Sequence, residues 1–435
     1  MRAREAAVQA LLACEKRGAW SDAYLNGLFD RASPDRRESA LAYRICAGVL
    51  QNREACDWYL QPYIKGKLQP TVKAILRSAV YQIAFMDRIP VSAAVNEAVE
   101  LAKRLANPGA ARLVNAVLRH LTANALPPLP EGDTAEELSI RYSHPQPLVE
   151  YFLEALGTEK TRAMLALNNE PAPLNLRVNR LKASPEEAAE VLRREGIEVF
   201  PSAMEGFFRV ENSGELTALK AFRDGMVTVQ DPAAALPVFA AAVQPGMTVL
   251  DCCAAPGGKS FLLAEQMKDQ GSILACDLHG NKLRRIEEGA QRLGINSIET
   301  CAADASKPLS AMKERFDLVL ADVPCSGMGV VRKKPEIRYK SFEQIEQLPK
   351  TQLAILEGAA ACLRSGGALI YSTCTLLKEE NESVTDAFLS LHPEFRRERF
   401  SLPDPFGLAE EGQRTVWPFE FETDGFYLCR LRKKT

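Results

Sequence analysis

The chain of 435 residues lacks the features that mark membrane and secreted proteins. No apolar run approaches the roughly 18 residues that a membrane-spanning helix needs. The basic N-terminus leads into a short amphipathic stretch with no small-residue cleavage site, which predicts no secretory signal. We also find no internal repeat and no low-complexity tract. We therefore expect a cytoplasmic protein without a membrane partner.

Cysteine spacing excludes two further classes. The 11 cysteines form no C-x-x-C pair, which argues against a thiol redox enzyme. They do not cluster with any of the 4 histidines at zinc-ligand spacing, so we expect no metal. An odd cysteine count without a secretory signal indicates reduced thiols, most of them small core residues.

Length and charge indicate several domains. A single hydrophobic core does not grow to this length, so two to four domains are expected. The first 130 residues hold 18 Lys and Arg against 11 Asp and Glu, a net charge of +7, which leaves −9 on the remainder. This basic front module indicates either a polyanion partner or a solvated helical surface, and charge alone does not separate the two.

Patterning divides the chain into four segments. Residues 1–125 show helical periodicity throughout, and residues 126–170 read as a proline-containing linker followed by helices. Residues 171–235 alternate between strand-like and helical pieces, which predicts a small α+β module. In residues 236–435, apolar strands alternate with helices, which predicts a Rossmann-like α/β domain with a parallel sheet. The predicted strands are 247–251, 272–277, 297–301, 316–321 and 368–372, with a closing pair at 414–417 and 425–432.

Ligands of such sheets bind beyond the carboxyl ends of the strands. The first strand ends in a loop, residues 251–260, that is neither a P-loop nor G-x-G-x-x-G. Asp277 ends the second strand, where an acid can accept both hydroxyls of a ribose, and Asp304 follows the third and could accept an adenine amine. An acid that binds ribose, in a site without a phosphate-binding motif, fits S-adenosylmethionine better than NAD. The alternative is that Gly257 and Gly258 only form a tight turn.

Two cysteines lie where chemistry is expected. Cys325 follows the fourth strand and Cys374 the fifth, so both should face the cofactor crevice. Carbon 5 of cytosine is a poor nucleophile, but a thiolate that adds to carbon 6 makes carbon 5 reactive toward a methylsulfonium. The alternative is two inert packing cysteines. The residues alone do not show which of the two would be the nucleophile.

A basic segment follows Cys325. It contains four cations that could hold phosphates around a base taken out of its stack: Arg332, Lys333, Lys334 and Arg338. The alternative is an exposed, solvated loop.

Three motifs, D-C-C-A-A-P-G-G-K-S, D-V-P-C-S-G and S-T-C-T, resemble those of the RNA cytosine-5 methyltransferases of the Nop2/Sun family. The resemblance covers about residues 170–435. It implies that Cys374 is the nucleophile, that Cys325 assists product release and that Asp322 contacts the cytosine edge. It also implies an S-adenosylmethionine and base pocket lined by Cys253, Ala254, Ala255, Pro256, Gly257, Gly258, Lys259, Asp277, Asp304 and Asp322. Arg177, Gln230-Asp231 and Asp424-Gly425-Phe426 match less specific family positions.

The front module resembles the NusB-like helical RNA-binding domain in residues 90–99 and 114–119. Its fusion to this catalytic domain is similar to the bacterial enzymes of the family that modify 16S ribosomal RNA. The resemblance implies methylation of carbon 5 of a cytosine in 16S RNA, and we expect the protein to be a monomer. Transfer RNA or large-subunit RNA remains an alternative substrate, and a non-catalytic antitermination-type factor remains an alternative class. Amine methyltransferases typically have a proline followed by an aromatic residue after the fourth strand. Here Cys325 follows Pro324, which disfavours an amine substrate.

Overall fold

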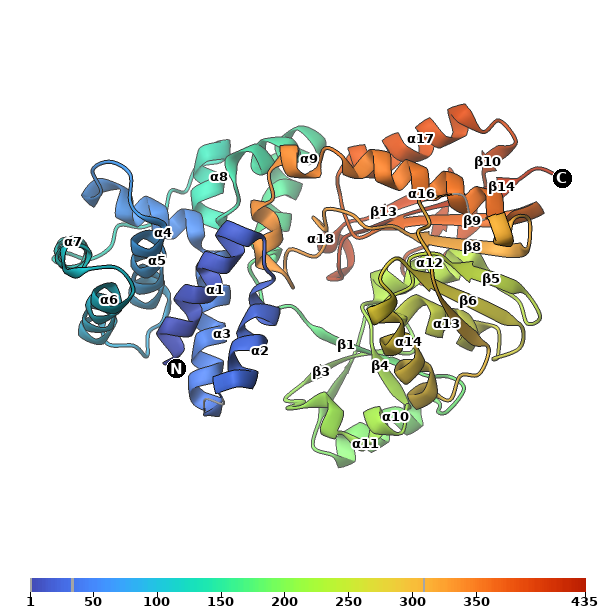
Figure 1. Ribbon diagram of the computed structural model, residues 1–435, viewed down its shortest axis with the longest axis horizontal. Coiled ribbons are helices and arrows are strands. Elements are labelled where there is room, and N and C mark those ends of the chain that lie inside the picture. The colour runs from blue at the N-terminus through green and yellow to red at the C-terminus, as the bar shows by residue number, and fades with distance from the viewer. Residues whose placement is uncertain (1, 33–34, 308–309) are drawn as a thin grey trace. The chain divides into compact units, whose positions relative to one another are not determined.

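The computed structural model describes residues 2–32, 35–307 and 310–435, which divide into two compact units (Figure 1). The first unit holds the chain up to Glu170 together with Val331–Tyr339. The second unit holds Pro171–Val330 and Lys340–Thr435. None of the described helices is long and apolar enough to cross a membrane.

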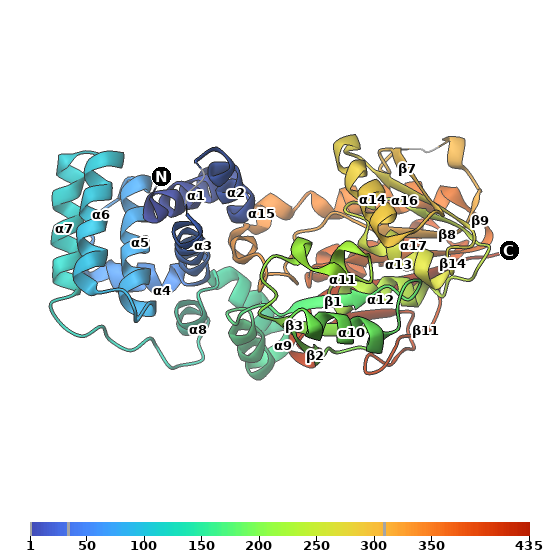
Figure 2. The ribbon, with the colours of Figure 1, turned by 90° about the horizontal axis from the view of Figure 1, so that it is seen from below.

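The first unit is helical, as the sequence predicts. Helices α6 and α7 pack side by side (Figure 2). Helices α3 and α5 approach closely at Gly48, where a Cβ would lie 1.9 Å from Cζ of Tyr81. The helices are α1 (Ala3–Arg17), α2 (Ser21–Ala32), α3 (Arg36–Gln51), α4 (Arg53–Leu60), α5 (Pro70–Phe85), α6 (Val91–Leu105), α7 (Pro108–Leu121), α8 (Ala135–Tyr142) and α9 (Gln146–Leu167), with short turns η1 (Gln61–Tyr63) and η4 (Pro335–Tyr339).

Helix α7 shows how local sequence defines these elements. The Asn107 side chain caps it by accepting a hydrogen bond from the Ala110 N–H at 2.9 Å, and Pro108 occupies the first turn. Val114 and Val117 are among its buried residues, at the spacing of one helical face. The cap determines where the helix begins, and the apolar face determines how it packs.

The α+β module opens the second unit. Its four-stranded antiparallel sheet has the order β2-β3-β1-β4. A capping box at Ser184 begins α10, since the Ser184 hydroxyl accepts from Glu187 N and the Glu187 carboxylate accepts from Ser184 N. The elements are β1 (Leu174–Val178), α10 (Pro185–Arg194), β2 (Glu198–Pro201), β3 (Phe207–Glu211), η2 (Leu216–Ala218), α11 (Lys220–Arg223) and β4 (Val227–Val229).

The main sheet confirms the predicted α/β domain. Its order is β10-β14-β9-β8-β5-β6-β7, with β13 paired to β14. Neighbouring strands from β7 to β9 are parallel, and β14 runs antiparallel to β9, β10 and β13. The strands are β5 (Thr248–Asp251), β6 (Ser272–Asp277), β7 (Ile298–Ala302), β8 (Phe316–Asp322), β9 (Leu363–Thr373), β10 (Phe395–Arg397), β13 (Gln413–Val416) and β14 (Phe426–Lys433), and a separate pair joins β11 (Phe400–Ser401) to β12 (Leu408–Ala409).

Helices cover both faces of this sheet (Figure 1). Along β8, Leu318 and Leu320 join the core cluster under α12 (Pro232–Ala241), α13 (Gly258–Gln266) and α14 (Gly280–Leu293). The alternate residues Val319 and Ala321 join the cluster under α16 (Leu348–Cys362), and α17 (Glu382–Leu391) packs with them. The short helices α15 (Phe342–Ile345) and α18 (Pro418–Phe421) and the turns η3 (Ser310–Met312) and η5 (Lys378–Glu380) complete the unit. This alternation on a doubly covered strand defines three layers.

Strand order also positions the candidate site. Strand β5 lies between β6 and β8, so the sheet reverses its direction of growth at β5. Ligands of open α/β sheets bind at such a switch point, outside the carboxyl ends of the strands. Asp251, Asp322 and Thr373 are the last residues of β5, β8 and β9. The predicted cofactor loop and both cysteine motifs therefore share one edge of the sheet.

Candidate active site

The structure brings the two predicted cysteines together. The Sγ atoms of Cys325 and Cys374 lie 3.2 Å apart, within hydrogen-bond distance, and both cysteines are free thiols. Both side chains are partly exposed. The hydrogen bond with Cys374, followed by burial, raises the pKa of Cys325 well above its ordinary value. The pair can therefore share a proton, with one sulfur as donor and the other as acceptor.

Close backbone packing holds the loop that carries Cys374. Gly329 N donates to the Cys374 carbonyl at 2.9 Å, and Gly425 N donates to the Gly329 carbonyl at 2.8 Å. A Cβ at Gly329 would lie 2.1 Å from the Gly425 oxygen and 2.9 Å from the Cys374 oxygen. Only glycine fits there, and the Asp424-Gly425-Phe426 segment is thereby linked to the thiol loops.

Asp322 lies in a fixed polar contact set. Lys259 Nζ donates to its Oδ2 at 2.6 Å, and Ser372 Oγ donates to its Oδ1 at 2.8 Å. The Lys259 ammonium also lies 4.9 Å from the centroid of the Phe426 ring. Helix α13 supplies the lysine and the ends of β8 and β9 supply the other two side chains. Asp322 is thus held by the Lys259 ammonium and the Ser372 hydroxyl near the two thiols. From there its carboxylate can orient a polar edge of a substrate.

The predicted cofactor loop forms a tight turn against Asp277. Gly257 adopts φ +110°, and a Cβ there would lie 2.4 Å from the Phe261 ring, so glycine is required. Asp277 Oδ2 accepts from Ala255 N at 3.3 Å, and Oδ1 accepts from His279 N at 2.9 Å. Helix α13 begins at Gly258, so its first backbone N–H groups lie at this loop.

Asp304 is held by its own turn. Its carboxylate accepts from Ser306 Oγ at 2.5 Å and from Ser306 N at 3.1 Å, and it pairs with Lys307 at 3.0 Å. The Ser306 hydroxyl and the Lys307 ammonium lower the pKa of Asp304. Asp304 therefore remains an acceptor, and these contacts give no direct link to Lys259 or Asp277.

The basic segment lies in the helical unit. Lys334 pairs with Asp22, Arg332 pairs with Glu170 at 3.5 Å, and Lys333 is exposed. Arg338 is fully buried. Its guanidinium donates to Asn169 Oδ1 at 2.8 Å and to backbone carbonyls of Gln51, Tyr142, Ser143 and Asn168 at 3.0–3.4 Å. This placement contradicts the expectation that Arg338 grips RNA phosphates, because five acceptors inside the helical unit already hold it.

The residues with less specific family matches form a buried network. Arg177 pairs with Glu265, and its Nε donates to Gln230 Oε1 at 2.5 Å. Asp231 Oδ1 caps α12 at Ala233 N and also accepts from Asp424 N at 3.1 Å. The network ties the α+β module to the main sheet. Glu265 was missed because nothing in its helical sequence distinguishes a buried carboxylate from a surface one.

Asp251 is a further carboxylate near the site, and the sequence predicted no role for it. It is 1% exposed, and its Oδ2 accepts from Ser260 Oγ at 2.7 Å. Burial, with a smaller effect from the negative charge of Asp322, raises the pKa of Asp251 to about 7. Asp251 therefore supports the loop from below and titrates near neutral pH.

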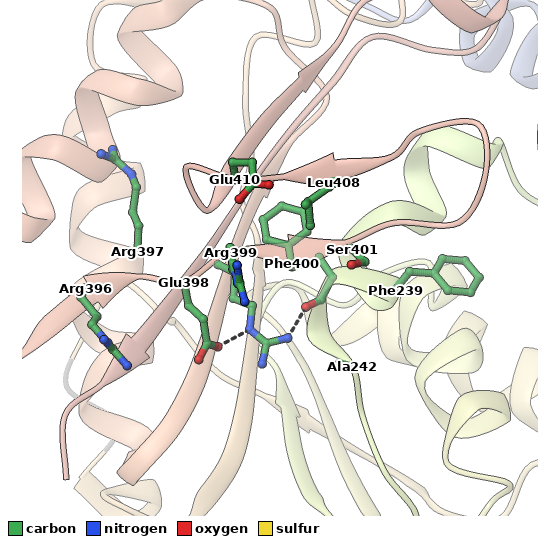
Figure 3. Close-up of a pocket in the computed structure, with 12 residues that line it drawn as sticks. Phe239, Ala242, Arg396, Arg397, Glu398, Arg399, Phe400, Ser401, Leu408 and Glu410 are labelled. Carbon is green, nitrogen blue, oxygen red and sulfur yellow. Dashed lines mark hydrogen bonds and ion pairs between the residues drawn. The ribbon is translucent and has the colours of Figure 1, made fainter.

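A cavity of about 1000 Å³ lies elsewhere in the second unit (Figure 3). Arg396, Arg399, Phe400 and Leu408 are among its lining residues, and Arg430 bridges the Glu398 carboxylate and the Ala240 carbonyl at 2.6 Å each. No lining residue belongs to the cysteine motifs. Within the described residues, no group of three His, Cys, Asp or Glu side chains could hold a metal ion.

Comparison with known families agrees with this arrangement. The family described as 16S rRNA methyltransferase RsmB/F matches residues 238–432, and the NusB family matches residues 1–123. A ferredoxin-like domain of RsmF/B-like methyltransferases matches residues 144–212. The fold and its site thus define an RNA methyltransferase with a helical NusB domain.

Full-length relatives define the family more narrowly. The probable ribosomal RNA small subunit methyltransferase B of Bacillus subtilis (strain 168) is 36% identical over 442 residues, covering 99% of this chain and 98% of the relative. The ribosomal RNA small subunit methyltransferase B of Vibrio cholerae is 35% identical, covering 92% and 90%. The crystal structure of PH0851 superposes with a TM-score of 0.82 at 28% identity, covering 99% and 98%. The chain belongs to the ribosomal RNA small subunit methyltransferase B family.

Proposed function

We propose that this protein transfers a methyl group from S-adenosylmethionine to carbon 5 of a cytosine in 16S ribosomal RNA, with Cys374 as the nucleophile. The observation that carries the proposal is the thiol pair, with sulfurs 3.2 Å apart. Methyl transfer to an amine or a hydroxyl needs no thiol, whereas carbon 5 of cytosine needs a nucleophile at carbon 6. Two thiols at neighbouring strand ends serve that need.

The residues at the switch point fit S-adenosylmethionine. The Asp277 carboxylate lies against the loop at 253–259, where it could accept hydrogen bonds from the ribose hydroxyls of the cofactor. The loop is compact, since Gly257 admits no side chain, and the N-terminus of α13 favours a carboxylate such as that of methionine. When bound, S-adenosylmethionine supplies the electrophilic methyl group. Asp304, in the turn after β7, would accept a hydrogen bond from the adenine amine.

The thiols and Asp322 would carry the remaining chemistry. The Cys374 thiolate adds to carbon 6 of the cytosine, and carbon 5 then accepts the methyl group. Loss of the carbon 5 proton to a base allows the Cys374 sulfur to leave, and we assign assistance in this release to Cys325. Asp322, already held by Lys259 and Ser372, would orient the N3 and N4 edge of the base.

RNA recognition would come from the helical unit. The net charge of +7 over the first 130 residues favours binding to a polyanion, and a second contact raises the effective concentration of RNA at the catalytic unit. Arg332, Lys333 and Lys334 remain candidates for phosphate contacts, although Arg332 and Lys334 already have acidic partners. We expect a monomer that acts in the cytoplasm.

The test is methyl transfer from labelled S-adenosylmethionine to unmodified 16S RNA, with transfer RNA and 23S RNA in parallel, followed by nucleoside analysis. We expect label in 5-methylcytidine from 16S RNA. Label in 5-methylcytidine from another RNA alone would keep the chemistry and reject the substrate. Absence of label from every RNA, with protein shown to bind the cofactor, would reject catalysis and favour a binding factor.

A further inference from the structure

A buried carboxylate lies beside the thiol pair and has no role in the chemistry described above. Glu380 is 1% exposed and belongs to η5, directly before α17. Its Oε2 accepts from the Ser326 backbone N–H and from Gln352 Nε2, both at 2.8 Å. Its Oε1 is buried and meets no hydrogen-bond donor in the described part of the chain.

Glu380 and Gln352 together grip the backbone on both sides of Cys325. Glu380 accepts from the residue after it, Ser326, while Gln352 Nε2 also donates to the carbonyl of the residue before it, Pro324, at 3.0 Å. The Ser326 hydroxyl is further bonded to Thr375 Oγ1 at 2.7 Å, which joins this loop to the one that carries Cys374. The carboxylate thus fixes the position of one thiol relative to the other.

The charges around Cys325 are mostly of one sign. The hydrogen bond to Cys374 and burial are the two largest causes of the raised pKa of Cys325. The negative charges of Cys374, Glu380 and Asp322 raise this pKa further. Tyr371 faces the same region with a hydroxyl that donates to the Glu380 carbonyl at 2.5 Å. The nearby cations are engaged elsewhere, Lys259 with Asp322 and Lys340 with the Ser326 carbonyl at 2.7 Å.

We infer that Glu380 is a positioning residue that keeps the proton of the thiol pair on Cys325, so that Cys374 carries the negative charge and acts as the nucleophile. When the pair loses one proton to solvent, the remaining proton sits on Cys325 and bridges to the Cys374 sulfur. That hydrogen bond stabilises the Cys374 thiolate. The role of Cys374 as nucleophile rests on the proposed function, but the distribution of charge between the two thiols does not require it.

The test measures which sulfur is the thiolate, without RNA or cofactor. Brief treatment with substoichiometric iodoacetamide at neutral pH, followed by peptide mass spectrometry, gives the ratio of alkylated Cys374 to alkylated Cys325. We expect the wild-type protein to be labelled mainly at Cys374. Glu380→Gln keeps the shape and the acceptor for Ser326 but removes the charge, so the ratio should fall roughly tenfold.

Matched variants separate charge from structure. Glu380→Asp keeps the charge and should retain a ratio closer to wild type than to Glu380→Gln, and Glu382→Gln, which removes a carboxylate two residues along, should leave the ratio unchanged. If Glu380→Gln fails to fold, Glu380→Ser replaces it with the same expectation. A folded charge-removing variant with the wild-type ratio overturns the inference. Loss of methylation chemistry in the RNA assay with the expected ratios would reject the proposed function alone.

Discussion

Replacing Asp251 by asparagine should flatten the pH dependence of stability in the second unit. Asp251 is buried, and its Oδ1 meets no donor in the described part of the chain. Its pKa rises from 3.8 to about 7 in the folded protein. The folded state therefore holds this proton up to a higher pH than the unfolded state does. The stabilisation is complete below pH 4 and is lost as the pH rises through 7.

The magnitude follows from the two pKa values. The interval from 3.8 to about 7 corresponds to about 4 kcal/mol of unfolding free energy. Between pH 5 and pH 8, the wild-type protein should lose about 3 kcal/mol more than Asp251→Asn does. Asparagine resembles the protonated acid and does not titrate. An unpaired amide donor at this position would add a constant cost of about 1–3 kcal/mol, which shifts the curve without changing its slope.

The assay is urea unfolding at several pH values with hydrogen exchange as the readout. Following peptides from β5 and β8 observes the second unit separately from the helical one. Asp404→Asn, at an exposed aspartate, is the control and should keep the wild-type slope. Parallel pH dependences for wild type and Asp251→Asn would refute the reasoning, because they would mean that Asp251 titrates alike in the folded and unfolded states.

Three other changes test separate parts of the site. Asp277→Ala should weaken S-adenosylmethionine binding by roughly tenfold or more in calorimetry, since it removes a charged acceptor for the ribose; unchanged affinity would place the cofactor elsewhere. Asp322→Asn should retain cofactor affinity while lowering kcat about hundredfold, and a full-rate variant would remove Asp322 from the base contact. Arg177→Met should cost about 3–5 kcal/mol in urea unfolding because Glu265 is left unpaired, and adding Glu265→Leu should restore much of it. A loss below about 1 kcal/mol would show that the ion pair is dispensable.

Much of the catalytic unit could be predicted because its signals are local. Apolar runs marked the strands now seen as β5 to β9, and the residues after the runs became the strand ends. Since neighbouring parallel strands end at the same edge, the sequence alone predicts that Cys325 and Cys374 lie together, as the structure shows. The Ser184 capping box and the Asn107 cap were predictable for the same reason, because each depends on residues within one turn.

What escaped prediction depends on contacts distant in sequence. The segment containing Arg338 reads as a charged loop, yet the guanidinium is buried among carbonyls from α3 to α9, and nothing local encodes those partners. Glu380 and Gln352 belong to separate helical stretches and meet only because both pack against the Cys325 loop. Asp251 shows the same limit, since an acid at a strand end is exposed or buried according to the helix that covers it.

The most direct test of the central claim is the fate of the RNA bound to cysteine variants in the presence of S-adenosylmethionine. With Cys325→Ala, 16S RNA should remain covalently attached to the protein and migrate slowly on a denaturing gel, because methyl transfer proceeds while release is impaired. With Cys374→Ala, no attached RNA and no 5-methylcytidine should form. An adduct from Cys374→Ala that is absent from Cys325→Ala would reverse the two roles, and 5-methylcytidine produced by Cys374→Ala would contradict the covalent mechanism.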